Sequence, residues 1–262
     1  GVPLRGEDYV AMFPHILGYA AFLGLFFRIF GESILAAAVL NVILTTVSCL
    51  LIFFLALRWK DRAAAVTVSL IWALCPSKML YNTMSLSEPY YTCLLLFFFV
   101  LVSEMEVPYN EERKTAPWKA AAFGLTAGIA AGLVNTARPI GVIPLIALVL
   151  WLLFLAEGRA VHTRWKTWVL FGVLLAAAYA GVGHLWQNYE TRVLGQLPPS
   201  VPGYSIYVGF NPETQGTYSD EDMDLLQSRY FGEYNRNAED AQQSMLHSAM
   251  ERIQEGRADL PA

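Results

Sequence analysis

A polar turn between two apolar runs holds the first residues that could do chemistry. Lys78 and Glu88 lie in this turn, which begins at Pro76 and ends at Pro89. Because proline interrupts helices, we expect the turn to be exposed between two helix ends. Lys78 can pair with an anionic phosphate, and Glu88 can orient a hydroxyl group or Lys78 itself. The alternative is a surface turn whose lysine only extends its ammonium group into water.

Two further candidates also stand at the ends of apolar runs. Arg138 lies in the short turn 135–139, directly before Pro139. A guanidinium group can bind phosphate through two parallel hydrogen bonds, or it can serve only as an interfacial anchor. His184 stands near the end of the last apolar run, beside Gln187 and Asn188. A lone histidine there is usually structural, and its functional alternative is to orient a substrate.

Two adjacent carboxylates, Glu7 and Asp8, precede His15 near the start of the chain. Such a pair can take up a proton from a reacting hydroxyl group or hold a divalent metal ion. The simpler alternative is that both carboxylates are solvated. The sequence has no HExxH, Walker, GxSxG or GxGxxG motif, so it leaves the metal requirement open.

The composition indicates that most of the chain is embedded in a membrane. Of its 262 residues 55% are hydrophobic and 15% are charged, and the mean hydropathy is +0.40. A soluble domain has about 25% charged residues. The net charge of −4 gives no electrostatic support for nucleic-acid binding. Cys49, Cys75 and Cys93 stand singly in apolar runs, which is typical of small buried residues.

Long apolar segments predict about six membrane crossings, because a helix needs about 20 apolar residues to cross the hydrocarbon core. The predicted crossings are 34–57, 63–75 with a continuation towards Tyr81, 89–102, 118–134, 140–156 and 167–186. The segment 118–134 is rich in alanine and glycine, which suits close helix packing. The segment 13–30 is apolar but short, so it either lies in the membrane interface or crosses as a short span.

The short loops predict the orientation, because cytoplasmic loops carry an excess of lysine and arginine. Loops on one side hold nine basic residues: Arg58, Lys60, Arg62, Arg113, Lys114, Lys119, Arg159, Arg164 and Lys166. Loops on the other side hold Lys78 and Arg138. We therefore expect Lys78, Arg138, His184 and the polar tail from Gln187 to be extracytoplasmic. Within that tail, apolar residues at four-residue steps predict a soluble helix over 237–253.

Several of these segments resemble one known group of membrane enzymes. The order and spacing of the motifs are similar to those of the GT-C membrane glycosyltransferases, and more narrowly of bacterial relatives of the protein O-mannosyltransferase and aminoarabinose-transferase families (glycosyltransferase family 39-like). The matching segments are Phe13-Pro14-His15-Ile16-Leu17-Gly18-Tyr19 with Arg28-Ile29-Phe30-Gly31, Cys75-Pro76-Ser77 through Tyr81-Asn82 to Ser87-Glu88-Pro89, Ala137-Arg138-Pro139, and Gly209-Phe210-Asn211 with Gly216-Thr217-Tyr218-Ser219 and Glu221-Asp222. The similarity covers nearly the whole chain.

The resemblance implies an all-α, polytopic transmembrane helical bundle of the GT-C type with an extracytoplasmic C-terminal segment. It implies transfer of a sugar from a polyprenyl-phosphate carrier in the membrane lipid to an acceptor on the outer face of the cell membrane. Residues 1–33 would form an extracytoplasmic loop with a juxtamembrane helix, 34–186 the transmembrane region, and 187–262 an extracytoplasmic soluble segment. Lys78 and Arg138 would bind the phosphate, while Glu88, His15 and His184 would orient the substrates.

The chain departs from the family pattern in one respect. The family's essential carboxylate, a general base or a ligand of a divalent metal ion, lies well before the position that corresponds to Pro14 and just after a first transmembrane helix. Asp8 and Glu7 are the candidates within this chain, but they lie too close to Pro14. We therefore expect a fragment, with the true base upstream of Gly1.

Two other classes of function remain open from the sequence. A transporter or flippase would place ionisable groups near the middle of its spans, beside broken helices, whereas the predicted spans here are nearly free of charge. A non-catalytic membrane scaffold is permitted by the acidic tail that follows Asp220. The sequence does not identify the sugar, the acceptor or the oligomeric state.

Overall fold

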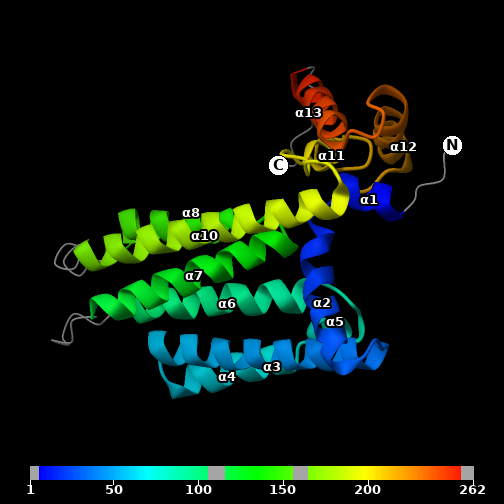
Figure 1. Ribbon diagram of the computed structural model, residues 1–262. Coiled ribbons are helices and arrows are strands. Elements are labelled where there is room, and N and C mark those ends of the chain that lie inside the picture. Colours follow the sequence, from blue (N-terminus) through cyan, green and yellow to red (C-terminus); the bar gives the residue numbers. More distant parts are fainter. Residues whose placement is uncertain (1–5, 106–115, 156–164, 255–262) are drawn as a thin grey trace. The chain divides into compact units, whose positions relative to one another are not determined.

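The computed structural model describes residues 6–105, 116–155 and 165–254, and every regular element in these ranges is a helix (Figure 1). The predicted all-α fold is therefore confirmed for the described residues. The chain divides into two compact units. We call His15–Trp186 the bundle unit, and Gly1–Pro14 together with Gln187–Ala262 the tail unit.

Four helices of the described residues are long and apolar enough to cross a membrane, and a bent pair of shorter helices makes a fifth if it counts as one span. The four are α3 (Ile34–Trp59), α6 (Glu88–Met105), α7 (Pro117–Ala137) and α10 (Trp165–Leu194). The bent pair is α4 (Arg62–Ala73) and α5 (Pro76–Thr83), which meet at 50°. Pro76 at the first position of α5 explains the break, since its ring disfavours a helical conformation at Cys75. The chain is thus a multi-pass membrane protein.

The prediction of about six crossings exceeds these four or five. The segment predicted at 140–156 forms α8 (Val142–Leu150), which continues as a π-helical turn, η1 (Trp151–Leu155). Its apolar helix, Val142–Phe154, is shorter than the four long spans. The helix begins late because the chain leaves α7 at Pro139 and turns through Gly141. Residues 156–164, where the prediction placed its end, lie outside the described residues.

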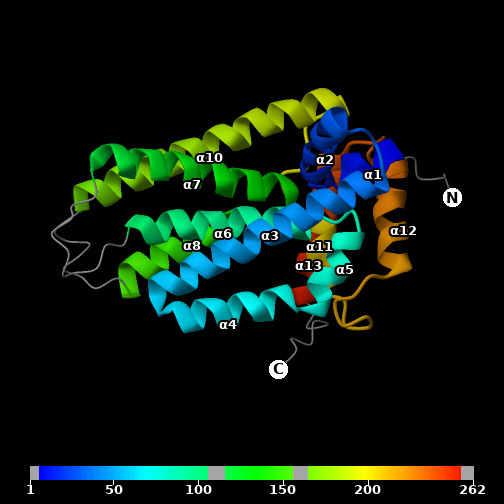
Figure 2. The ribbon, with the colours of Figure 1, turned by 90° about the horizontal axis from the view of Figure 1, so that it is seen from below.

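The helices of the bundle unit run alternately in opposite directions, so each connection lies at one of two ends (Figures 1 and 2). Arg58, Lys60, Arg62, Lys119 and Lys166 stand at the end where α3 stops and where α4, α7 and α10 begin. Lys78 and Arg138 stand at the opposite end, in α5 and just after α7. The described basic residues therefore separate as the sequence predicts. Arg113, Lys114, Arg159 and Arg164 lie outside the described residues, and which end faces the cytoplasm stays a prediction.

Glycines of α7 allow close packing against α10. A Cβ atom on Gly124 would lie 2.5 Å from the carbonyl oxygen of Phe171, and one on Gly128 would lie 2.3 Å from that of Leu175. Because these neighbours are backbone atoms of α10, the two helices touch where glycine leaves room. Phe98 of α6 and Phe171 are both fully buried in the same core cluster. The small-residue segment thus brings α7 to its neighbours as the sequence predicts.

Helix α2 (Ile16–Phe30) has 15 residues and lies across the end of the bundle that holds α5 (Figure 1). It is an apolar helix below the length of the long spans. Gly18 packs against the last turn of α7, where an added Cβ would lie 2.1 Å from the Thr136 carbonyl oxygen. Tyr19 is buried beside Tyr90 and Ala137. Close packing therefore holds the start of α2 against the end of α7.

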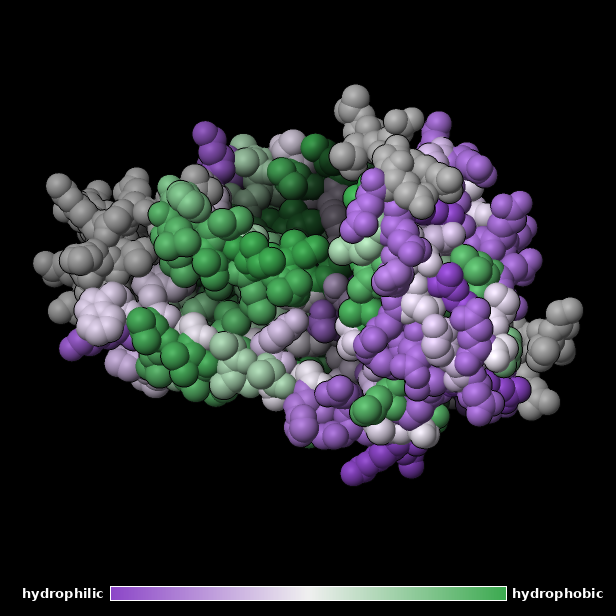
Figure 3. All heavy atoms as spheres, turned by 90° about the horizontal axis from the view of Figure 1, so that it is seen from above, coloured by the Kyte–Doolittle hydropathy of each residue, from purple (hydrophilic) through white to green (hydrophobic). Residues whose placement is uncertain are grey.

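The tail unit is built from four helices and one π-helical turn around a small core. They are α1 (Gly6–Met12), α11 (Gly203–Gly209), α12 (Asp220–Ser228), η2 (Arg229–Glu233) and α13 (Ala238–Gln254). The helix predicted over 237–253 is confirmed by α13, and Ala241, Met245 and Ala249 are fully buried. Met12 of α1 is buried in the same core. Hydrophilic residues gather on the surface of this unit, and hydrophobic residues cover much of the bundle face shown in Figure 3.

Candidate functional site

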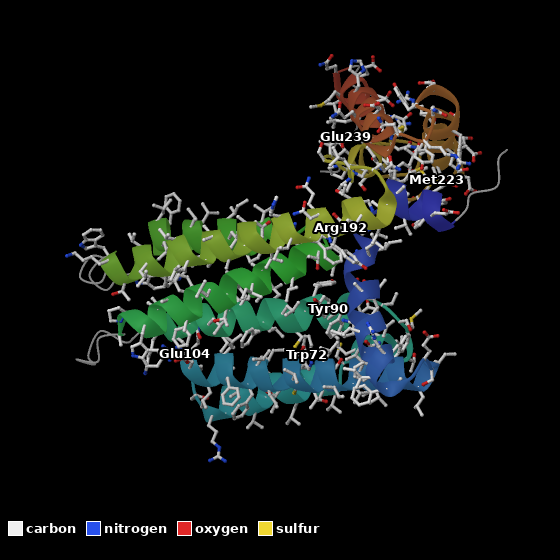
Figure 4. All side chains as sticks on the ribbon, viewed as in Figure 1. Trp72, Tyr90, Glu104, Arg192, Met223 and Glu239 are labelled. Carbon is white, nitrogen blue, oxygen red and sulfur yellow. The ribbon has the colours of Figure 1, made fainter. Side chains whose placement is uncertain are left out.

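The polar residues best placed for chemistry stand where α6 begins and α7 ends. Glu88 and Pro89 open α6, and Arg138 follows α7 directly. Arg138 has an extended backbone (φ −147°, ψ 130°), as expected for a residue before proline. The side chains of Tyr90 and Tyr19 fill the apolar space beneath this end. Figure 4 shows Tyr90 at this end of the bundle and Glu104 at the other.

The guanidinium group of Arg138 forms an ion pair with the Glu88 carboxylate, although the two residues are 50 positions apart. Its Nη2 donates to Glu88 Oε1, its Nε lies 3.4 Å from Ser87 Oγ, and the group lies 5.6 Å from the centre of the Tyr91 ring. The arginine side chain is 44% exposed, but that of the glutamate is only 19% exposed. Glu88 Oε2 is buried and has no hydrogen-bond partner among the described residues. The pair therefore combines an accessible cation with a buried carboxylate oxygen that lacks a hydrogen-bond donor.

His15 precedes α2 and lies near the same arginine. Burial, and then the positive charge of Arg138, lower the pKa of His15 below its ordinary value. The imidazole is therefore neutral at pH 7 and carries both a donor and an acceptor nitrogen. A neutral imidazole beside a guanidinium group can orient a hydroxyl group without adding further positive charge.

Lys78 stands in the first turn of α5, at the same end of the bundle. Its ammonium nitrogen lies 4.5 Å from the centre of the Trp72 ring and 5.6 Å from that of Tyr81. The sequence left open whether Glu88 orients Lys78, and the structure instead pairs Glu88 with Arg138. Lys78 thus belongs to a neighbouring cation–aromatic cluster.

One buried asparagine holds this second cluster in place. Asn41 is fully buried in α3, and its side-chain amide donates to the carbonyl oxygens of Met84 at 2.7 Å and Tyr81 at 3.3 Å. Its own Oδ1 accepts from the hydroxyl group of Tyr19 at 3.4 Å. Asn41 thereby joins α2, α3 and the end of α5. An asparagine inside an apolar run was the sequence signal for this role, but the sequence could not name its partners.

The remaining predicted site residues lie elsewhere. His184 is exposed on α10, and no hydrogen bond or ion pair among the described residues joins it to Arg138 or Glu88. Glu7 is exposed, whereas Asp8 is 5% exposed in the core of the tail unit. Asp8 Oδ1 accepts from the Tyr230 hydroxyl group at 3.5 Å and lies 3.9 Å from Arg236 Nε.

These contacts join one carboxylate oxygen of Asp8 to η2 and the turn after it, while Asp8 Oδ2 is buried and has no hydrogen-bond partner among the described residues. No group of three or more histidine, cysteine, aspartate or glutamate residues in the described part of the chain could hold a metal ion.

Comparison with models of known protein families finds no match, and no curated protein or solved structure matches the chain. In the described residues, the fold is all-helical with several helices long and apolar enough for a multi-pass membrane protein, and the site is an arginine–glutamate pair at one end of the bundle.

Proposed function

We propose that this chain belongs to an integral membrane glycosyltransferase of the GT-C type, which moves a sugar from a polyprenyl-phosphate carrier to an extracytoplasmic acceptor. The observation that carries the proposal is the Arg138–Glu88 pair, with an exposed guanidinium group and a buried, unpartnered carboxylate oxygen. Lys78 at the same end of the bundle adds a second cation. The order and spacing of the motifs that resemble this class support the same reading.

The reaction requires a general base and positive charge beside the leaving phosphate, and this end of the bundle offers the positive charge. An acceptor hydroxyl group attacks the anomeric carbon and gives its proton to a general base, the bond from that carbon to the phosphate oxygen breaks, and polyprenyl phosphate leaves with the bonding electrons. Negative charge on the leaving phosphate grows in the transition state, so Arg138 and Lys78 stabilise that state more than the ground state. Glu88 Oε2 and the neutral imidazole of His15 orient the acceptor hydroxyl group.

The test is sugar transfer by the protein at its full natural length, in liposomes that contain polyprenyl-phosphate sugar and an acceptor. We expect Arg138→Ala to lower kcat by about 10²–10³-fold, the usual effect of removing one donor that stabilises developing charge. Arg138→Lys should lie between that variant and the wild type, because it keeps the charge and loses the forked geometry. Lys78→Ala should also lower kcat.

Lys119→Ala is the matched control, since Lys119 stands at the opposite end of the bundle over the Trp118 ring. It should leave transfer unchanged. Wild-type rates in both Arg138→Ala and Lys78→Ala would end the proposed phosphate role. A higher KM with an unchanged kcat would show that the two cations contribute only uniform binding.

One observation favours a transporter as a second candidate. The break of 50° between α4 and α5 is the kind of interruption that transporters place near their substrate sites. The break stands beside Lys78 rather than beside a mid-span cluster of ionisable groups. Movement of the intact lipid-linked sugar across the liposome membrane, without any glycosidic product, would favour this function over transfer.

A further inference from the structure

An apolar groove of about 480 Å³ lies between α3, α6 and α8, away from the Arg138–Glu88 pair. Its walls include Ala56 and Trp59 of α3, Phe98 of α6, and Ala147 with Trp151 at the end of α8. We call it the α3–α8 groove. Its volume falls within the range of about 300–1,000 Å³ that is typical of small-molecule sites.

The lining of this groove excludes a polar occupant. Ser103 is the one lining residue with a hydroxyl group, and its Oγ donates to the carbonyl oxygen of Val100 in its own helix. The other lining residues offer aliphatic and aromatic surface, with the indole N–H groups of Trp59 and Trp151 as the remaining donors, so an occupant gains mainly dispersion and burial of apolar area. Ala56 and Ala147 are small, and their size leaves the space open. A narrow hydrocarbon chain meets these conditions.

The dimensions also argue against a transmembrane helix as the occupant. A helix about 10 Å across that spans about 30 Å of hydrocarbon has a volume of roughly 2,400 Å³. The groove is smaller than that volume. It is therefore far better matched to a single flexible chain.

Positive charge and an aromatic ring stand at the end of the groove. Trp59 is 66% exposed, and the next residue, Lys60, is exposed as well. Arg58 lies 3.5 Å from Glu104, which compensates part of its charge. Lysine beside tryptophan is typical of the level of lipid headgroups. Anionic headgroups are attracted to such residues at the membrane surface.

We propose that the α3–α8 groove binds one acyl chain of an anionic membrane phospholipid, whose phosphate group pairs with Lys60. The leaflet concerned is the one at the end of the bundle where α3 stops. This lipid is separate from the carrier of the proposed reaction, because Lys60 follows the end of α3 and Arg138 follows the end of α7, and these two helices stop at opposite ends of the bundle unit (Figure 1). The bound chain covers the exposed side of Trp151 and fills the space left by the two alanines.

The experiment is photo-crosslinking in nanodiscs with two probes that share one diazirine-labelled acyl chain. One probe has a phosphatidylglycerol headgroup and the other a phosphatidylcholine headgroup. Labelled peptides are mapped by mass spectrometry. We expect label on 55–59, 98–103 and 147–151, with the anionic probe favoured about fivefold, which is the equivalent of roughly 1 kcal/mol for one lysine.

Two variants separate the groove from the headgroup. Ala147→Phe fills the groove and should abolish the label, whereas Ile146→Phe is the control, because Ile146 is exposed on the same helix and does not line the groove. Lys60→Gln is a surface change that should not affect folding. It should reduce labelling by the phosphatidylglycerol probe to the level seen with the phosphatidylcholine probe.

Three results would overturn the proposal. They are equal labelling by both probes in the wild-type protein, unchanged labelling in Ala147→Phe, and a headgroup preference that survives in Lys60→Gln. Sugar transfer need not change in any of these variants, so the outcome does not depend on the proposed reaction.

Discussion

Gly18 and Gly24 lie on the same helix, α2, but the structure predicts opposite outcomes when each is replaced by alanine. A Cβ on Gly18 would lie 2.1 Å from the carbonyl oxygen of Thr136 and 2.7 Å from the backbone nitrogen of Ala137. A Cβ on Gly24 would meet nothing within 4 Å. The pair thus tests whether α2 is held against the end of α7 by this close approach.

The expected magnitude follows from these distances. To reach an ordinary contact, α2 and the end of α7 must move apart by roughly 1.3 Å, and neither group is a flexible side chain that can turn away. Overpacking of this kind costs about 1–3 kcal/mol. Gly24→Ala should instead gain about 0.5–1 kcal/mol, because alanine loses less backbone entropy than glycine in a helix.

The same shift reaches the candidate site. His15 precedes α2 by one residue, and Arg138 follows Thr136 by two. A displacement of about 1 Å in a catalytic arrangement can lower a rate by about 10²-fold. We therefore expect Gly18→Ala to lower sugar transfer and Gly24→Ala to leave it unchanged.

The assay is the free energy of unfolding in mixed micelles, measured by titration with a denaturing detergent, together with the transfer rate. Gly18→Ala should be about 1.5–4 kcal/mol less stable than Gly24→Ala, the sum of the cost and the gain given above. Equal stabilities, or a Gly18→Ala variant that matches the wild type, would refute the close approach of α2 to α7.

Three further predictions concern the bundle, the histidine and the tail. Gly128→Ala should destabilise the protein by about 1–3 kcal/mol, because its Cβ would lie 2.3 Å from a carbonyl oxygen of α10. Gly172→Ala is the control and should not destabilise the protein, because a Cβ there meets nothing within 4 Å. Equal detergent-unfolding midpoints for the two variants would contradict the prediction. Because folding lowers the pKa of His15, the unfolded state binds the proton more readily, so the free energy of unfolding should fall as the pH drops below the ordinary value of 6.5. His15→Gln should flatten that part of the stability–pH profile. An unchanged slope in this variant would argue against the role of His15. Asp222 is 4% exposed and lies 3.1 Å from Arg252. Arg252→Ala should therefore cost about 3–5 kcal/mol of stability, because it leaves the buried carboxylate without its ion-pair partner. Hydrogen exchange over 203–254 should speed up in this variant, and wild-type protection there would count against the role of the pair.

The parts of the fold that depend on neighbouring residues followed from the sequence. Long apolar runs can satisfy their backbone hydrogen bonds in lipid only as helices, so α3, α6, α7 and α10 were predictable. Proline at 76 and 139 indicated where helices are interrupted. The helix near 140–156 begins two residues later than predicted, since hydropathy alone does not reveal where a turn through Gly141 ends.

The site was predicted only as separate residues. Lys78, Glu88, Arg138 and His15 were each selected because ionisable groups at the ends of apolar runs are costly unless they have a role. The sequence proposed Lys78 as one possible partner of Glu88, and the tertiary structure supplies Arg138 instead. Which cation pairs with a carboxylate depends on how helix ends meet, and local sequence does not contain that information.

The sequence by itself determined that this chain has long apolar helices, a polar tail and basic residues divided between two ends, because hydrophobicity, proline and charge act through neighbours along the chain. Only the tertiary structure decided that Glu88 meets Arg138, that Asp8 is buried in the tail unit, and that three helices leave a groove beside Trp59. Those features depend on contacts between residues far apart in the chain. Several residues of the same chemistry are available as partners, and the packing of the helices selects one of them.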